Sequence, residues 1–324
     1  MINVLILSAG RRVELIQRFR RAKEKLNIDG TIVAVDISAS APAVHFADKY
    51  YLIPRIGAPD YISAIIDVCC KEKISLIVPT IDTELMTLSD HREQIESVTG
   101  AKLLLSRPEV IRICRDKNNT QAFFVDNDFG VPHQLTESEI ADGNYTFPLF
   151  IKPKDGSSSI NTFKVENKEQ LDFFLNYVKE PMVQEFMVGT EYSVDVFCDF
   201  DSRPITIVPR VRLAVRGGEI AKGVIHKDRD IINDVTRLLN VLKPIGHITV
   251  QCMKTEKGIR YIEINPRFGG GAPMSIDAGA DSCANLYRLL SGEQLTYNEE
   301  YADGRTFVRF DSSIMLDENM ERIL

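Results

Sequence analysis

Hydrophobic and polar positions alternate in blocks along the first third of the chain. The short apolar runs are NVLILS (3–8), TIVAVD (31–36), SLIVPT (75–80) and KLLLS (102–106). Between them lie stretches with the apolar spacing of a helix, at 12–26, 60–72 and 84–98. Short β-branched runs that alternate with helical patterns form a parallel sheet with helices on both faces. We therefore predict a doubly wound α/β domain over residues 1 to about 105.

A different pattern begins after a polar connecting segment at 106–135, which has helix patterns on each side of Asp116-Lys117. From Phe147 onward, apolar and polar residues mostly alternate one by one, as they do along strands with one buried face. Helices are expected at 168–178, 228–242 and 282–292. This part of the chain is therefore predicted to be α+β, with antiparallel hairpins.

Composition narrows the class of protein. Hydrophobic residues make up 44% and charged residues 26%, which are ordinary values for a globular chain. No stretch approaches the roughly 18 to 20 apolar residues of a membrane span, so no membrane segment is expected. A net charge of −7 argues against a nucleic-acid partner. None of the six cysteines forms a C-x-x-C pair, which indicates a reducing, cytoplasmic setting.

The segment YIEINPRFGGG (261–271) places polar side chains on every second residue of a predicted strand. Glu263, Asn265 and Arg267 would share one face, while Ile262 and Ile264 would point into the core. The preceding strand HITVQCMK forms a hairpin with it, which brings Gln251 close to Glu263. Oxygen ligands without His or Cys suit a hard cation such as Mg²⁺. The alternative is an exposed hairpin face with scattered polar residues.

Several other segments contain candidate ligands for a phosphorylated substrate. Lys152 ends an apolar strand and precedes a Gly/Ser loop at 155–159 that could cover phosphates, or could be an ordinary hairpin loop. Backbone groups at 185–187 could bind an adenine edge, and Glu191 could bind a ribose. A predicted hairpin carries four basic residues, Arg210, Arg212, Arg216 and Lys222. Such a cluster suits anionic ligands, although the same residues could equally be exposed to solvent without binding one.

The first predicted strand-to-helix turn, Ser8 to Arg12, partly imitates a dinucleotide fingerprint together with Asp36. Only one of the three glycines of G-x-G-x-x-G is present, so NAD binding has weak support. A tight turn that holds an anion with the help of Arg11 or Arg12 is the better interpretation. Scattered histidines make a zinc site improbable, and no G-x-S-x-G motif supports a hydrolase.

Taken in order, these motifs resemble the ATP-grasp superfamily. The resemblance depends on FIKP (150–153), on VQEF followed by GTEYSVDV (183–196), and on Gln251 followed by IEINPR (262–267). The chain is most similar to single-module relatives of the carbamoyl phosphate synthase large chain and to carboxylate–amine ligases of the pyrrolysine-pathway type. The resemblance implies a Rossmann-like pre-ATP-grasp domain (1–105), a small ATP-grasp subdomain with a Gly/Ser-rich flap (106–180) and a C-terminal subdomain with the magnesium site (181–324).

The resemblance also implies roles for individual residues. Lys117, Lys152 and the flap residues Gly156, Ser157 and Ser158 would contact the ATP phosphates. Glu185 and Phe186 would form the adenine hinge, and Glu191 would bind the ribose. Gln251, Glu263 and Asn265 would bind Mg²⁺, with Mn²⁺ as a possible substitute. Arg267, Lys152 and Arg212 would act in catalysis, and Lys222 would assist at a phosphate or a substrate carboxylate.

The implied activity is phosphorylation of a carboxylate by ATP, followed by attack of an amine on the acyl phosphate. Small-molecule acids and amines are then the expected partners, and the chain could form a homodimer. Two alternatives stay open. One is phosphorylation of bicarbonate or carbamate together with a partner protein, and the other is a non-catalytic ATP-binding regulator.

Overall fold

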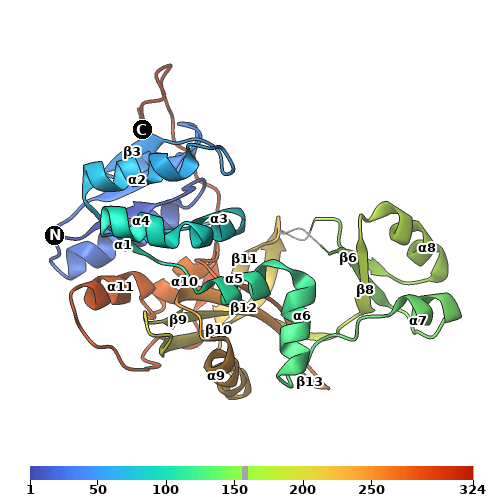
Figure 1. Cartoon of the computed structure of the whole chain (residues 1–324). Helices are drawn as coiled ribbons and strands as arrows, with labels where there is room; N and C mark the ends of the chain where they lie inside the picture. Colours follow the sequence, from blue (N-terminus) through green and yellow to red (C-terminus); the bar gives the residue numbers. More distant parts are fainter. Residues whose placement is uncertain (155–159, 324) are drawn as a thin grey trace.

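The computed structural model describes residues 1–154 and 160–323, in which the strands form three separate sheets (Figure 1). The first is a five-stranded parallel sheet with the order β3-β2-β1-β4-β5. Its strands are β1 (Asn3–Ile6), β2 (Ile32–Asp36), β3 (Lys49–Leu52), β4 (Ile74–Val78) and β5 (Lys102–Leu103). The associated helices are α1 (Val13–Lys25), α2 (Tyr61–Glu72), α3 (Leu85–Asp90) and α4 (Arg92–Thr99), with short 3-10 turns η1 (Pro42–Phe46) and η2 (Asp82–Glu84). This confirms the predicted doubly wound domain.

Successive residues of the parallel strands are buried on opposite faces of this sheet. Val4 and Ile6 belong to a hydrophobic cluster that includes α1, whereas Leu5 and Leu7 belong to the cluster that includes α2 and α3. Both faces are covered because side chains alternate along a strand while helices lie on each side. The continuous apolar runs of the sequence follow directly from this double burial.

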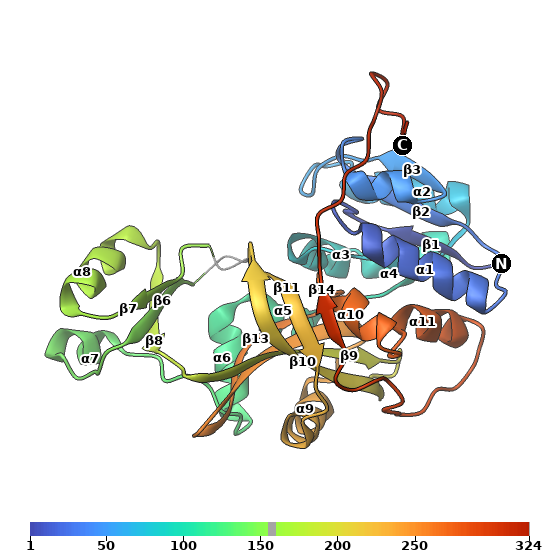
Figure 2. The ribbon, with the colours of Figure 1, turned by 180° about the vertical axis from the view of Figure 1, so that it is seen from behind.

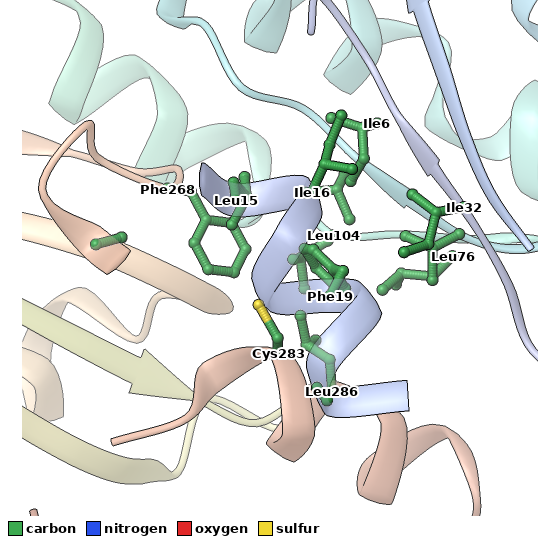
Figure 3. Packing of buried hydrophobic residues seen from close by; sticks show 14 of the residues in the cluster. Ile6, Leu15, Ile16, Phe19, Ile32, Leu76, Leu104, Phe268, Cys283 and Leu286 are labelled. Carbon is green, nitrogen blue, oxygen red and sulfur yellow. The ribbon is translucent and has the colours of Figure 1, made fainter. Parts of the chain in front are cut away.

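Helix α1 also packs against the C-terminal part of the chain (Figure 3). Phe19 makes edge-on contacts with Phe268 at 6.0 Å and with Tyr287 at 6.1 Å between ring centroids. Tyr287 lies on α11 (Ser282–Leu290), and the short helix α10 (Ala272–Asp277) completes this part of the same core. The first domain is therefore held against the C-terminal region by a shared hydrophobic core.

The central sheet has six strands in the order β13-β12-β9-β10-β11-β14. Its strands are β9 (Gly189–Cys198), β10 (Pro204–Arg216), β11 (Glu219–Ile225), β12 (Gly246–Thr255), β13 (Gly258–Asn265) and β14 (Thr306–Val308). Neighbouring strands are antiparallel throughout. Helices α5 (Pro108–Arg115), α6 (Lys117–Asp126) and α9 (Arg229–Leu242) pack their apolar side chains onto this sheet.

A small three-stranded antiparallel sheet forms a separate lobe beside the central sheet (Figure 1). It consists of β6 (Leu149–Pro153), β7 (Phe163–Val165) and β8 (Pro181–Glu185), and carries α7 (Glu137–Asp142) and α8 (Lys168–Tyr177). The lobe differs from the expected 106–180 unit at both ends. Val110 and Phe124 are buried in the core of the central sheet, and β8 continues the small sheet past residue 180.

After β14 the chain runs back along the first domain (Figure 2). Arg309 lies 3.4 Å from Glu14 of α1, and the Arg322 guanidinium lies over the Phe46 ring at 4.6 Å. Among the described residues, no helix is both long and apolar enough to cross a membrane.

Candidate active site

Two adjoining cavities lie where the three sheets meet. The larger, of about 820 Å³, is bounded by the first domain and the central sheet, and the smaller, of about 470 Å³, lies between the central sheet and the small lobe. Both are lined by Lys117, Arg212, Gly218, Gln251, Ile262 and Glu263. The predicted cluster of oxygen ligands on β12 and β13 therefore lies at their junction.

The β12–β13 hairpin has the predicted register at its polar end. Gln251 lies directly opposite Glu263, and its Nε2 donates to Glu263 Oε1 at 2.6 Å. Asn265 Nδ2 donates to the same oxygen at 2.9 Å. The interpretation of an exposed hairpin face is therefore not supported, because these three side chains converge at the cavities.

One detail of this strand differs from the prediction. Ile262 lines both cavities instead of joining the core, and Tyr261 is buried in its place. The pairing shifts between Gln251 and Cys252, so that Ile262 is an extra residue on β13. A bulge of this kind changes the alternation of side chains along one strand of the pair.

The donor set at this junction fits a hard cation. Rotating the two side-chain amides by 180° would present both amide oxygens beside the Glu263 carboxylate, because the N and O atoms of an amide occupy similar positions. Carboxylate and amide oxygens are typical ligands of Mg²⁺. Among the residues that the structure describes, no group of three or more His, Cys, Asp or Glu forms a candidate metal site. A cation here would thus depend on one carboxylate and two amides.

Two lysines bring positive charge to the same place. Lys152 lines the smaller cavity and is only 8% exposed, and Lys117 lines both. Burial, together with repulsion from Lys117, lowers the pKa of Lys152 to about 8, while the Glu263 carboxylate opposes this shift. Lys117 Nζ donates to the backbone oxygen of Pro153 at 2.8 Å, which fixes its position next to the end of β6.

The smaller cavity combines apolar walls with polar groups at its edge. Its apolar lining comes from Phe150, Ile160, Phe186, Met187, Val215, Met253 and Ile262. Among the described residues, the amide N–H of Met187 has no acceptor, so it is available to a ligand. The Glu185 side chain accepts a hydrogen bond from the His133 amide at 3.1 Å. In this segment the backbone groups, rather than the Glu185 side chain, are therefore the ones that can bind a ligand. Such a slot suits a flat aromatic base.

Glu191 and Arg212 form a close pair at the edge of this slot. Glu191 Oε1 lies 2.9 Å from Arg212 Nε, although the N–H is not aligned for a hydrogen bond. Arg212 also donates to Ser193 Oγ at 3.1 Å and to the Gly218 backbone oxygen at 3.3 Å. The Glu191 carboxylate can therefore accept hydrogen bonds from sugar hydroxyls, while the Arg212 guanidinium faces the larger cavity.

Two residues of the first domain complete the larger cavity. Arg267 Nη2 donates to Asp82 Oδ2 at 2.6 Å, and Arg12 Nη1 donates to Glu219 Oε1 at 3.3 Å. Burial lowers the pKa of Arg12, whereas Glu219 opposes this effect. The roles of Asp82 and Glu219 were not predicted. The only sequence signal for Asp82 is its place just after the carboxyl end of β4, where parallel sheets commonly bind ligands.

The predicted turn from Ser8 to Arg12 reaches this cavity through Arg12, and its binding of an anion stays a prediction. Asp36 is engaged by the turn itself. Its carboxylate accepts from the Gly10 amide at 2.8 Å and from the Ser38 amide at 3.3 Å, so it stabilises the turn.

The basic hairpin is not one continuous patch. Arg210 is buried against Asp195, and Arg216 pairs with Asp311 outside both cavities. Lys222 is exposed at the pairing of β11 with β14, and the described linings of the two cavities do not include it. Arg212 is therefore the best placed of the four for the predicted role. The flap residues Gly156, Ser157 and Ser158 lie outside the described residues.

Comparisons with known families agree with this architecture. Residues 4–103 match the family described as PylC-like, N-terminal domain, and residues 114–271 match the ATP-grasp domain family. Together the two matches extend from β1 to the Gly269–Gly271 segment. They include the described residues that line both cavities.

Curated relatives are distant. D-alanine–D-alanine ligase B of Clostridium perfringens is 24% identical over 192 residues, which cover 52% of this chain and 63% of the relative. The formate-dependent phosphoribosylglycinamide formyltransferase of Ignicoccus hospitalis is 23% identical over 264 residues, which cover 73% of this chain and 63% of the relative. The chain thus spans less than two thirds of the length of these relatives.

Solved structures share the fold over most of the chain. N5-carboxyaminoimidazole synthetase from Staphylococcus aureus complexed with ADP superposes with a TM-score of 0.71 at 15% identity, covering 91% of this chain and 79% of that one. The biotin carboxylase domain of the Hydrogenobacter thermophilus 2-oxoglutarate carboxylase, in complex with MgADP, ADP and bicarbonate, has a TM-score of 0.70 at 18% identity and covers 93% of this chain and 72% of that one. On the matched families and the shared fold, this chain belongs to the ATP-grasp superfamily, with a PylC-like N-terminal domain.

Proposed function

We propose that this protein is an ADP-forming ligase that activates a carboxylate with ATP and joins it to an amine. The observation that carries the proposal is the position of Gln251, Glu263 and Asn265 between two cavities that also contain Lys117, Lys152 and Arg267. One cavity suits a nucleoside, and the other is rich in arginine and suits anionic substrates. The shared wall is where a γ-phosphoryl group and a carboxylate would meet.

The smaller cavity would bind ATP with its base between the apolar side chains and its sugar near Glu191. Lys117 and Lys152 would then lie beside the phosphates, where their charge stabilises the phosphoryl group during transfer. A substrate carboxylate oxygen attacks the γ-phosphorus, the bond to the ADP oxygen breaks, and ADP leaves. The amine then attacks the acyl carbon, and phosphate and a proton are released.

Gln251, Glu263 and Asn265 would hold Mg²⁺, or Mn²⁺ in its place. When bound, such an ion neutralises phosphate charge and polarises the transferring group. Arg267 lies next to this cluster, with its Nη2 3.1 Å from Asn265 Oδ1. We propose that its guanidinium orients the acid and stabilises the negative charge of the acyl phosphate.

The test is a screen for ADP release in the presence of Mg²⁺ over pairs of small carboxylates and amines, including amino acids and bicarbonate with ammonia. Glu263→Gln should reduce ADP release by at least about a hundredfold, since one charge-stabilising group is worth about two to three powers of ten. The matched control is Glu256→Gln, in the exposed turn of the same hairpin, and it should behave as wild type. Equal activity of wild type and Glu263→Gln would refute the assigned site.

The screen also separates the alternatives. ADP release with bicarbonate alone would favour carbamoyl-phosphate-type chemistry. A protein that binds ATP but forms no ADP with any pair would instead be a non-catalytic ATP-binding protein.

A further inference from the structure

Glu84 is a carboxylate that lies completely inside the first domain, with an exposed fraction of 0%. It stands directly beside the larger cavity, because Thr80 to Thr83 belong to the lining of that cavity. A glutamate is almost never fully buried unless it is paired, since a charge is costly away from water. Among the described residues, Glu84 is bound by four neutral hydrogen-bond donors instead of a cation. The elements that supply these donors therefore indicate what the carboxylate does.

One oxygen of Glu84 binds the loop that follows β4. Its Oε1 accepts from the amides of Thr80 at 2.8 Å and Ile81 at 3.2 Å, directly before Asp82. A glutamate at the third position of a helical turn commonly bonds back to the amide that precedes the turn, and Glu84 has this position in η2. Capping of η2 accounts for Oε1, but it requires no second oxygen.

The other oxygen binds two elements that are distant in the sequence. Oε2 accepts from Ser8 Oγ at 2.6 Å, just after β1, and from the Tyr61 hydroxyl at 3.1 Å, at the start of α2. Ser8 has a φ of 45°, in the left-handed region that residues other than glycine rarely adopt. Such a conformation persists only where the surroundings fix it. Thr80 Oγ1 donates to the Ser8 backbone oxygen at 2.8 Å, so the ends of β1 and β4 are bound to each other as well as to Glu84.

The ends of β1 and β4 lie at the point where the strand order of the parallel sheet reverses. The two strands are neighbours, and the chain continues from β1 to β2 on one side and from β4 to β5 on the other. Doubly wound sheets bind ligands outside the carboxyl ends of the strands at such a point. Here the turn after β1 brings Arg12 to the larger cavity, and the loop after β4 brings Asp82, which binds Arg267 at 2.6 Å. Glu84 thus connects the two loops that bring Arg12 and Asp82 to this cavity.

We propose that Glu84 is a positioning residue for turnover: it fixes the loops after β1 and β4, and thereby the places of Arg12 and Asp82, and Asp82 in turn orients Arg267. The role in turnover rests on the proposed ligase function, whereas the fixing of the two loops does not. Glu84 does not belong to the described lining of either cavity, so it acts through these residues and not on a ligand.

The direct test is hydrogen–deuterium exchange of the full chain without ligands, measured by mass spectrometry on peptides that contain residues 8–12 and 79–83. Glu84→Gln keeps the size of the side chain but replaces one oxygen by an NH₂ group, which cannot accept a hydrogen bond. Either the Thr80 and Ile81 amides or the two hydroxyls then lose their acceptor. Exchange in at least one of the two peptides should therefore become about tenfold faster.

The matched control is Glu72→Gln. Glu72 is also a buried carboxylate of the first domain and also accepts from a tyrosine hydroxyl, that of Tyr51. It lies at the opposite end of β1, where its backbone oxygen accepts from Asn3 Nδ2 at 2.7 Å. Exchange in both peptides of this variant should therefore stay as in wild type.

Turnover separates positioning from general stability. With the acid and amine found by the screen for ADP release, kcat per folded molecule of Glu84→Gln should fall about tenfold or more. The Kd for MgATP should stay unchanged, because no residue of the first domain belongs to the described lining of the smaller cavity. Glu72→Gln should keep both values even if it lowers the thermal midpoint. The double variant Glu84→Gln/Asp82→Asn should lose less than the product of the two single losses, because both substitutions act through Arg267.

Wild-type exchange in both peptides of folded Glu84→Gln would overturn the fixing of the loops, and wild-type kcat would overturn the role in turnover. If circular dichroism shows that Glu84→Gln is unfolded, Ser8→Ala removes a single hydrogen bond to Oε2 and gives the same test. Ser8→Ala should exchange faster over 8–12 and have a severalfold lower kcat, and wild-type values of both would overturn the proposal. Absence of ADP release from wild type with every acid and amine would count against the ligase function alone, because the exchange measurement needs no substrate.

Discussion

Arg267 donates a 2.6 Å hydrogen bond to Asp82, which ties the central sheet to the first domain across the larger cavity. Arg267 follows Glu263 and Asn265 of β13, and Asp82 follows the parallel strand β4. The arginine that we propose as catalytic is therefore oriented by a residue from a different domain. The first domain accordingly contributes to the geometry of the candidate site as well as to the wall of the larger cavity.

Asp82→Asn should impair turnover without affecting nucleotide binding. The substitution keeps the size of the side chain but removes the charge that holds Arg267, and hydrogen bonds between charged groups contribute about 1.5 to 3 kcal/mol. We expect kcat to fall about tenfold or more while the KM for ATP stays unchanged. Steady-state kinetics of ADP release with the pair found by the screen would measure both.

The conservative variant Asp82→Glu should recover part of the lost kcat, as expected for a residue that positions another. Asp67→Asn, in an exposed position of α2, is the control and should have wild-type kinetics. A rise in the KM for ATP with unchanged kcat in Asp82→Asn would contradict this assignment.

The affinity for ATP should depend on pH through Lys152. Its pKa of about 8 means that the phosphate-binding charge is present below pH 8 and is lost as pH rises through that value. The Kd for MgATP, measured by calorimetry from about pH 7 to about pH 9.5, should increase about tenfold. Lys152→Arg should abolish this increase because a guanidinium stays charged throughout. A wild-type Kd that does not change with pH would contradict the role of Lys152.

The same group also affects folding. Lys152 has a folded-state pKa of about 8, below its ordinary value of 10.5, so the unfolded chain binds more protons between these values. The contribution of this lysine to the free energy of unfolding should therefore increase as pH rises over that interval, which stabilises the folded chain. Lys152→Met should lack this contribution, which urea unfolding at several pH values would detect.

Arg212 and Lys222, two of the four basic residues predicted for the hairpin, should behave differently. Arg212 faces both cavities and contacts Glu191, so Arg212→Met should weaken MgATP binding about tenfold or more. Lys222→Met should leave both MgATP binding and ADP release unchanged, because Lys222 is exposed where β11 pairs with β14. Loss of ADP release in Lys222→Met would instead support the role that the sequence predicts for Lys222.

Residue spacing along one strand was sufficient to predict the convergence of Gln251, Glu263 and Asn265, because strand alternation and a short hairpin are local properties. The bulge at Ile262 was not predictable, since an inserted residue leaves no distinct pattern in a single sequence. The pairing of Arg267 with Asp82 depends on packing between domains, and that of Arg210 with Asp195 depends on which strands become neighbours. Contacts of this kind, between segments that are distant in the sequence, can be identified only from the three-dimensional structure.

The orientation of the first domain should depend on Phe19. Its ring is fully buried between Phe268, the residue after Arg267, and Tyr287. Phe19→Ala would leave a cavity in this shared core, and such truncations cost about 3 to 5 kcal/mol. Urea unfolding should show a shift of that size, whereas Phe310→Ala, at an 85% exposed side chain, should change stability by less than about 0.5 kcal/mol. In the folded fraction of Phe19→Ala, kcat should also fall, because the loop that contains Arg267 loses its support. The Kd for MgATP should stay constant, because neither Phe268 nor Tyr287 belongs to the described lining of the smaller cavity. Unchanged kcat would mean that the Arg267 loop is held without help from α1.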